Sequence, residues 1–81
     1  MTADQMQVGV RYIVTHPSND MEFQAGDKIM LCADGSIENV QAEGWMEAHD
    51  VPEATRGMHC EIDTAYIERK RARLLAELAR L

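Results

Sequence analysis

The final 18 residues of the chain, 64–81, constrain its fold most, because their charge and pattern oppose those of the rest. Residues 1–63 carry 12 acidic and 3 basic side chains, whereas residues 64–81 carry 2 acidic and 5 basic ones. The whole chain has a formal net charge of −6. An acidic body followed by a basic tail therefore offers two surfaces of opposite charge to partners.

The tail has the periodicity of one amphipathic helix. At about 100° per residue, four of its large apolar side chains fall within about 60° of one another. No glycine or proline interrupts the segment after Gly57, and Asp63 or Thr64 can cap the first turn by accepting a backbone N–H. The apolar face is Ile67, Leu74, Leu78 and Leu81, and the bases Arg69, Lys70, Arg73 and Arg80 lie on the remaining face.

The apolar face of this helix has two interpretations. The simpler one is that it packs on the protein's own core, since an isolated helix of this length is marginal in water. The other is that it contacts a partner or a second copy, which the seven-residue spacing of Ile67, Leu74 and Leu81 favours. The positions between them hold Lys70 and Glu77, so a regular coiled-coil seam is not specified. A homodimer is expected, because 81 residues build only a modest core.

The acidic body has the alternation of short β-strands joined by tight turns. The Asp34-Gly35 pair predicts a hairpin, since glycine takes the positive φ that such a turn needs. A loop with a helical turn is expected over residues 49–57, which contain Pro52. The predicted strands are residues 8–15, 28–33, 36–42, 44–48 and 58–62. The side chains predicted to face the core are Val8, Val10, Tyr12, Val14, Ile29, Leu31, Ala33, Met58, Cys60 and Ile62.

The chain is long enough for one domain. We expect a flexible N-terminus over residues 1–7 and a single domain over residues 8–81, with a β-sheet body at 8–62 and the C-terminal helix at 64–81. The N-terminal residues lack the basic and apolar regions of a secretory signal, and no apolar run is long enough to cross a membrane. A cytoplasmic protein with reduced thiols at Cys32 and Cys60 is therefore expected.

One stretch of the body resembles a known family. FQAGDKIML, from Phe23 to Leu31, is followed by Asp34-Gly35-Ser36-Ile37, and together they resemble the pattern of SH3-like small β-barrels, in which a Gly-Asp turn launches a strand. The resemblance implies a module that binds peptide, protein or nucleic acid rather than an enzyme. In size and make-up the chain also resembles small accessory proteins of phages and prophages, which implies binding and inhibition of a host protein.

These observations combine into one expected architecture. It is an α+β protein: a small SH3-like antiparallel curled sheet or barrel of about five strands, followed by a long C-terminal amphipathic helix.

The sequence contains no recognisable catalytic or metal-binding pattern. Cys32, His49, His59 and Cys60 include zinc-ligating residue types, but their spacing matches no zinc motif, and adjacent strand residues such as His59 and Cys60 point to opposite faces. Gly-rich phosphate loops are absent. We therefore expect no enzyme, no metal and no cofactor.

Two surfaces remain as candidates for binding. Trp45, the only tryptophan, is interpreted first as a core anchor and second as a half-exposed anchor for a basic partner. The acids Glu38, Glu43, Glu47, Asp50 and Glu53 would steer such a partner, although many proteins are acidic for solubility alone. The alternative function is nucleic-acid binding by the helix bases Arg69, Lys70, Arg71, Arg73 and Arg80, which the overall acidity disfavours.

Overall fold

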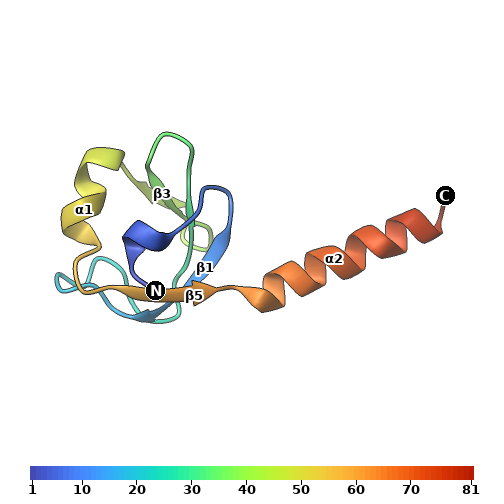
Figure 1. Cartoon of the computed structure of the whole chain (residues 1–81), viewed down its shortest axis with the longest axis horizontal. Coiled ribbons are helices and arrows are strands. Elements are labelled where there is room, and N and C mark those ends of the chain that lie inside the picture. Colours follow the sequence, from blue (N-terminus) through green and yellow to red (C-terminus); the bar gives the residue numbers. More distant parts are fainter.

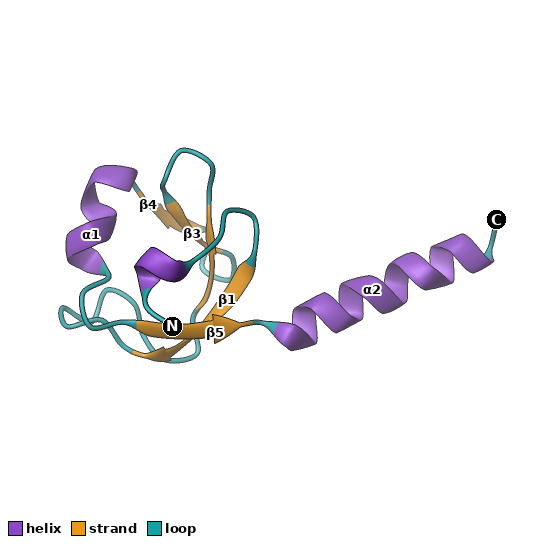
Figure 2. Cartoon of the chain, in the orientation of Figure 1, coloured by secondary structure: helices purple, strands orange, loops and turns teal.

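Five short strands form one antiparallel sheet, and a long helix follows the last of them (Figures 1 and 2). The computed structural model describes all 81 residues. The predicted α+β fold class, with five antiparallel strands followed by a C-terminal helix, is confirmed. The strands are β1 (Arg11–His16), β2 (Lys28–Leu31), β3 (Ile37–Asn39), β4 (Gly44–Met46) and β5 (His59–Ile62). The helical segments are η1 (Ala3–Gln5), η2 (Ala48–Asp50), α1 (Val51–Ala54) and α2 (Thr64–Ala79).

The strands lie in the order β4-β3-β2-β1-β5, so β1 to β4 form a meander and β5 returns to lie beside β1. Tyr12 is opposite Ile29 on one side and Ile62 on the other, which places β1 inside the sheet. The register between β1 and β5 shifts between Val14 and His16. The sheet is curled but not closed, because β4 and β5 are its two edges.

Alternate residues of the strands supply the core, as their pattern predicts. Tyr12, Val14 and Ile29 are each at most 1% exposed, and Ile37, Met58 and Cys60 are equally buried. Three residues predicted to face inward do not. Val8 precedes β1 and is 57% exposed, and Ile62 is 43% exposed where β5 leaves the body for α2. Ala33 lies beyond the end of β2 and is exposed as well.

The N-terminal residues, which we predicted to be flexible, pack against the body in the structure. Met6 is buried in the core, and the Met1 ammonium donates to the carbonyl oxygen of Cys60 at 2.9 Å, while the Cys60 N–H donates back to Met1 at the same distance. The Gln7 N–H donates to the Tyr12 hydroxyl at 2.8 Å. Residue 1 therefore covers part of the β5 edge, and Met6 adds a side chain to the core that the alternation of the strands does not predict.

Helix α2 projects away from the sheet (Figure 1). None of its residues is buried, and the molecule is consequently elongated, with extents of 48 × 24 × 22 Å. The interpretation that the leucine face packs on the protein's own core is therefore wrong. The sheet buries its inner face against α1, the N-terminal segment and its own curl, and no residue of α2 belongs to that core.

The joint between sheet and helix is a single residue, Asp63, which is 1% exposed. Its N–H donates to the Arg11 carbonyl oxygen at 2.9 Å, and its Oδ1 accepts the Tyr66 N–H at 3.1 Å, which is the predicted N-cap. The Arg11 guanidinium lies 3.8 Å from the centre of the Tyr66 ring. These contacts connect the start of α2 to β1.

Both cysteines are free, and their environments differ. Cys60 is fully buried, and this burial raises the pKa of its thiol. Cys32 is half-buried at the turn after β2. We expect alkylation of the native protein to modify Cys32 and to spare Cys60 until urea unfolds the chain, because the thiolate is the reactive form.

Mass spectrometry after timed alkylation checks this difference. Cys32→Ser removes the more accessible thiol and isolates Cys60. Equal alkylation rates of that variant in buffer and in urea would contradict the buried position of Cys60.

Candidate functional site

Trp45 lies on the edge strand β4 and is 73% exposed, so its first interpretation as a core anchor is wrong. The register explains its position. Met46 is opposite the buried Ile37 and takes the inward place, while Trp45 is opposite Glu38 and points outward. The buried aromatic side chains are Tyr12 and Phe23 instead.

A hollow lies beside Trp45, on the side of β4 that faces the loop between β1 and β2, and a second hollow adjoins it. The hollow of about 220 Å³ is bounded by Trp45, Phe23 and Met46, and its neighbour of about 240 Å³ shares Glu22 and Met46 with it. We call the two together the acidic groove. Its charged lining residues are Asp20, Glu22, Asp50 and Glu53.

The acidic groove has no positively charged lining residue, and none of its carboxylates pairs with a lysine or arginine. The pKa of Asp20 is lowered from its ordinary 3.8, chiefly by the backbone N–H of Glu22 and then by the Ser18 hydroxyl. These donors lie 3.1 and 2.9 Å from Asp20 Oδ1. Asp20 therefore keeps its negative charge at acidity that neutralises an ordinary aspartate.

Asp20 and Glu22 reach the groove because their loop is tied to the segment before β5. The buried Ser18 hydroxyl accepts the Phe23 N–H at 3.0 Å, and the Asn19 N–H donates to the Arg56 carbonyl oxygen at 2.7 Å. The loop between β1 and β2 is thus held against the segment that follows α1.

Of the five acids predicted to steer a partner, the structure places only some in the acidic groove. Asp50 and Glu53 line the acidic groove, whereas Glu43 and Glu47 are exposed outside it, and Glu38 lies half-buried across from Trp45. Sequence reasoning missed Asp20 and Glu22. The fold brings both residues, which lie far from Glu53 in sequence, to the same hollow as Glu53.

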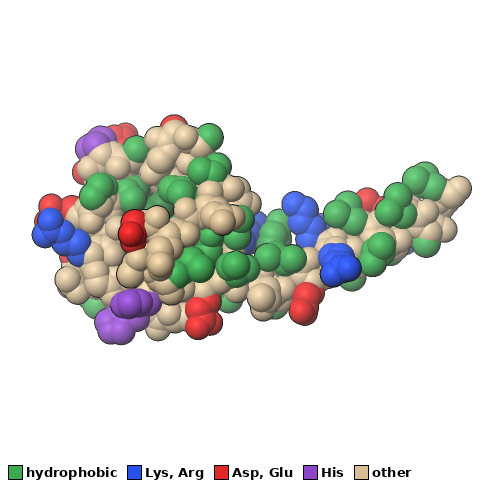
Figure 3. Space-filling view, viewed as in Figure 1, with side chains coloured by type: hydrophobic (Ala, Val, Ile, Leu, Met, Phe, Trp, Pro, Cys, Tyr) green, Lys and Arg blue, Asp and Glu red, His purple; other side chains and the backbone are tan.

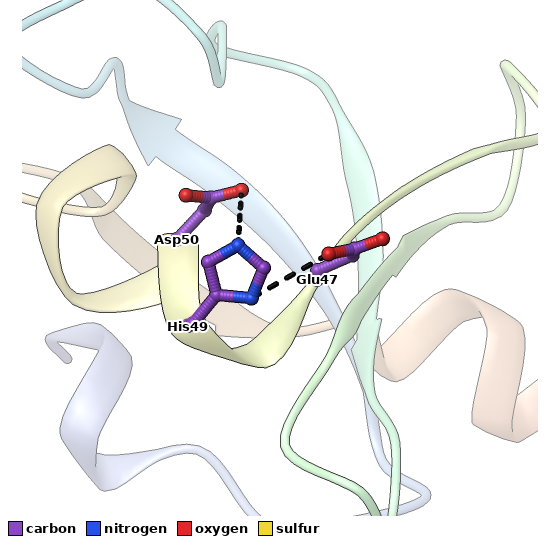
Figure 4. Close-up of side chains that lie close together, drawn as sticks. All are labelled: Glu47, His49 and Asp50. Atoms are coloured by element: carbon purple, nitrogen blue, oxygen red, sulfur yellow. Dashed lines mark ion pairs between the residues drawn. The ribbon is translucent and has the colours of Figure 1, made fainter.

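His49, in the helical turn η2, lies between two carboxylates (Figure 4). Its Nδ1 is 3.5 Å from Glu47 and its Nε2 is 3.4 Å from Asp50. The three side chains are exposed, no fourth metal-ligating side chain joins them, and no buried hydrogen bond orients them. This arrangement is that of surface ion pairs, which contribute little free energy, rather than of a built metal centre.

The other sulfur- and imidazole-bearing residues are dispersed. Cys60 faces the core and His59 is exposed, because adjacent residues of a strand point to opposite faces. The His59 ring lies 6.0 Å from the His16 ring. No three of Cys32, His49, His59 and Cys60 come together. The structure therefore gathers neither a zinc ligand set nor a thiol–imidazole pair from these four residues.

A second surface lies where α2 leaves the sheet. A groove of about 400 Å³ separates the start of β1 from the first half of the helix, and its lining is mostly apolar. We call it the root groove. It is lined by Gly9, Val10, Arg11, Tyr66, Ile67, Lys70, Arg71, Leu74 and Leu75.

The helix bases are exposed as predicted. Arg69, Lys70 and Arg73 surround Tyr66, and Arg80 lies at the far end of α2.

The largest hollow, of about 460 Å³, lies between the N-terminal segment and residues 51–59, and its charged lining residues, Asp4 and Arg56, balance each other.

No helix of the protein has the length and apolar character needed to cross a bilayer. Comparisons with protein-family models, with curated proteins and with solved structures found no match.

Proposed function

We propose that the protein is a small acidic protein-binding module that takes a lysine- or arginine-rich segment of a partner into the acidic groove. One observation supports this most: the only tryptophan is exposed at the end of a groove lined by four carboxylates and no base. A basic partner segment would complement that charge along the whole groove.

Trp45 supplies the anchor in this proposal. Exposed tryptophans are enriched among the residues that dominate binding free energy, and a cation over an indole ring gains about 0.5–2 kcal/mol. The carboxylates of Asp20, Glu22, Asp50 and Glu53 would attract the partner before contact and orient it. Because β4 is an edge strand, its outer backbone groups are also open to an extended partner segment.

The sheet order favours an SH3-like small barrel, in which binding modules are common. The meander, the return of β5 beside β1 and the helical turn at η2 and α1 between β4 and β5 support that assignment. An inhibitor encoded by a phage or mobile element would use the same surface, since small size and an acidic body suit the capture of a basic host surface.

The test is binding of a fluorescein-labelled lysine-rich peptide, followed by anisotropy at low and at moderate salt. The double variant Glu22→Lys and Glu53→Lys is expected to weaken binding by about tenfold or more at low salt and to flatten its salt dependence, because it removes the steering charge. Trp45→Ala is expected to weaken binding with little change in stability, since its side chain is exposed.

A matched control shows whether position or net charge matters. Asp4→Lys with Glu61→Lys changes the net charge equally, at exposed residues outside the groove, and is expected to bind nearly as the unaltered protein does. Equal losses in both double variants would reduce the effect to overall charge, and an unchanged groove variant would remove the proposed site. Glu43→Lys with Glu47→Lys, near Trp45 but outside the groove lining, should slow association less.

Nucleic-acid binding by α2 is the second candidate, because Arg69, Lys70, Arg73 and Arg80 are exposed and none is paired with a carboxylate. A gel-shift with single- and double-stranded DNA and RNA separates it from the first. Only this candidate predicts salt-sensitive binding that is lost when residues 64–81 are removed and kept when the acidic groove is altered.

A further inference from the structure

Helix α2 exposes an apolar face that nothing in the chain covers (Figure 3). Ile67 is 45% exposed, Leu74 51% and Leu78 64%, and Leu75 adjoins them. A helix of 16 residues is marginal in water without tertiary contacts. Its stability therefore depends on an occupant for this face.

The root groove defines what that occupant must carry. Its floor is apolar, from Val10, Ile67 and Leu74, so a row of apolar side chains is required. Its rim bears Arg11, Lys70 and Arg71 and no acid, so the occupant must also present a carboxylate or leave these bases in water.

We propose that the occupant is the α2 helix of a second copy, aligned antiparallel, so that two chains form a symmetric dimer and each fills the other's root groove. The second half of α2 offers the required chemistry, because Leu74, Leu78 and Leu81 form an apolar row and Glu77 is its only acid. This surface is separate from the acidic groove and leaves it open in both copies.

Alignment of Leu74 of the two copies beside the two-fold axis matches charges as well as apolar side chains. It brings the partner's Leu81 to Ile67 and the partner's Glu77 to Lys70, on the same flank of the seam. A parallel alignment would leave Lys70 and Glu77 about 10 Å apart along the axis, because seven residues separate them.

The charge of the whole chain favours the same alignment. Residues 1–63 carry 12 acids and 3 bases, whereas α2 is basic. The antiparallel pair places the two acidic bodies at opposite ends and brings Arg80 of each helix toward the body of the other copy. A parallel pair would put the two acidic bodies side by side.

The seam is more regular than the sequence interpretation suggested. Ile67, Leu74 and Leu81 occupy one position of the heptad, and Arg71 and Leu78 occupy the other. Arg71 is the only polar member, and its long aliphatic stem can cover the seam while its guanidinium reaches water.

Sedimentation equilibrium of the full chain over a wide concentration range tests the proposal. The unaltered protein is expected to approach twice 9.1 kDa as its concentration rises. Leu74→Glu is expected to raise the dimer dissociation constant about a hundredfold or more, since it places two carboxylates beside the axis and removes two buried leucines. Ala76→Glu adds the same charge on another face of α2 and is expected to leave the dimer intact.

A charge exchange tests the alignment. Lys70→Glu and Glu77→Lys are each expected to weaken the dimer, and the double variant is expected to restore it, because the antiparallel pairs then reform with reversed signs. A monomer at all concentrations, a dimer indifferent to Leu74→Glu, or a double variant weaker than either single one would each overturn the proposal. Circular dichroism of each variant identifies any loss of the helix itself.

Discussion

Replacement of Tyr12 by alanine is expected to remove most of the free energy of unfolding at 25 °C. Tyr12 is 1% exposed, and its strand β1 is paired on both sides, with β2 and with β5. Truncation of a large aromatic side chain in a core costs about 3–5 kcal/mol. A domain of this size has a free energy of unfolding near the lower end of the usual 5–15 kcal/mol, so this loss consumes most of it.

Urea titration followed by far-ultraviolet circular dichroism measures the effect, and Tyr12→Phe is the matched control. The phenylalanine ring fills the same volume and removes only the hydroxyl that accepts the Gln7 N–H, so a loss of about 1 kcal/mol is expected. An alanine variant as stable as the unaltered protein would show that Tyr12 does not pack between these strands.

Replacement of Met6 by aspartate is expected to lower the free energy of unfolding by about 3 kcal/mol or more. Met6 is 7% exposed and belongs to the core, although it precedes the first strand. A carboxylate at this position is either buried without a partner or forces residues 1–7 off the body, and both outcomes destabilise the fold.

Gln7→Asp is the control for Met6, because Gln7 is the exposed neighbour and its side chain makes no hydrogen bond. It is expected to change stability by less than about 0.5 kcal/mol. The flexible N-terminus expected from the sequence makes the opposite prediction, since a free tail would tolerate aspartate at both positions equally. The same urea titration therefore decides between the two descriptions.

Periodicity allowed the elements of this protein to be predicted. Strand residues such as Val14, Ile29 and Cys60 alternate because each strand buries one face, and that rule acts locally along the chain. The helix and its cap at Asp63 were predicted for the same reason. Amphipathicity does not, however, specify what covers the apolar face, because Leu74 and Leu78 would show the same pattern against a sheet or against another chain.

The positions that prediction missed depend on contacts between distant residues. Trp45 points outward because β4 pairs with β3 in a register that gives the inward place to Met46, and a three-residue strand contains too little pattern to reveal this. Likewise, Asp20 and Glu53 are separated by most of the sheet in sequence, and the bond from Asn19 to Arg56 helps to bring their loops together. Two of the four carboxylates of the acidic groove, Asp20 and Glu22, could therefore not be predicted from sequence patterns.

The single-residue joint at Asp63 gives α2 the properties of a lever arm. The helix has 16 residues, hence a length of about 24 Å, and it is fixed to the body only near Asp63, Tyr66 and Arg11. A rotation of about 10° at this joint moves the far end of α2 by about 4 Å, because displacement grows with the length of the arm. Small changes in the pairing of β1 with β5 are thereby amplified into large displacements at Leu81, so the sheet and anything bound to the helix tip are mechanically coupled.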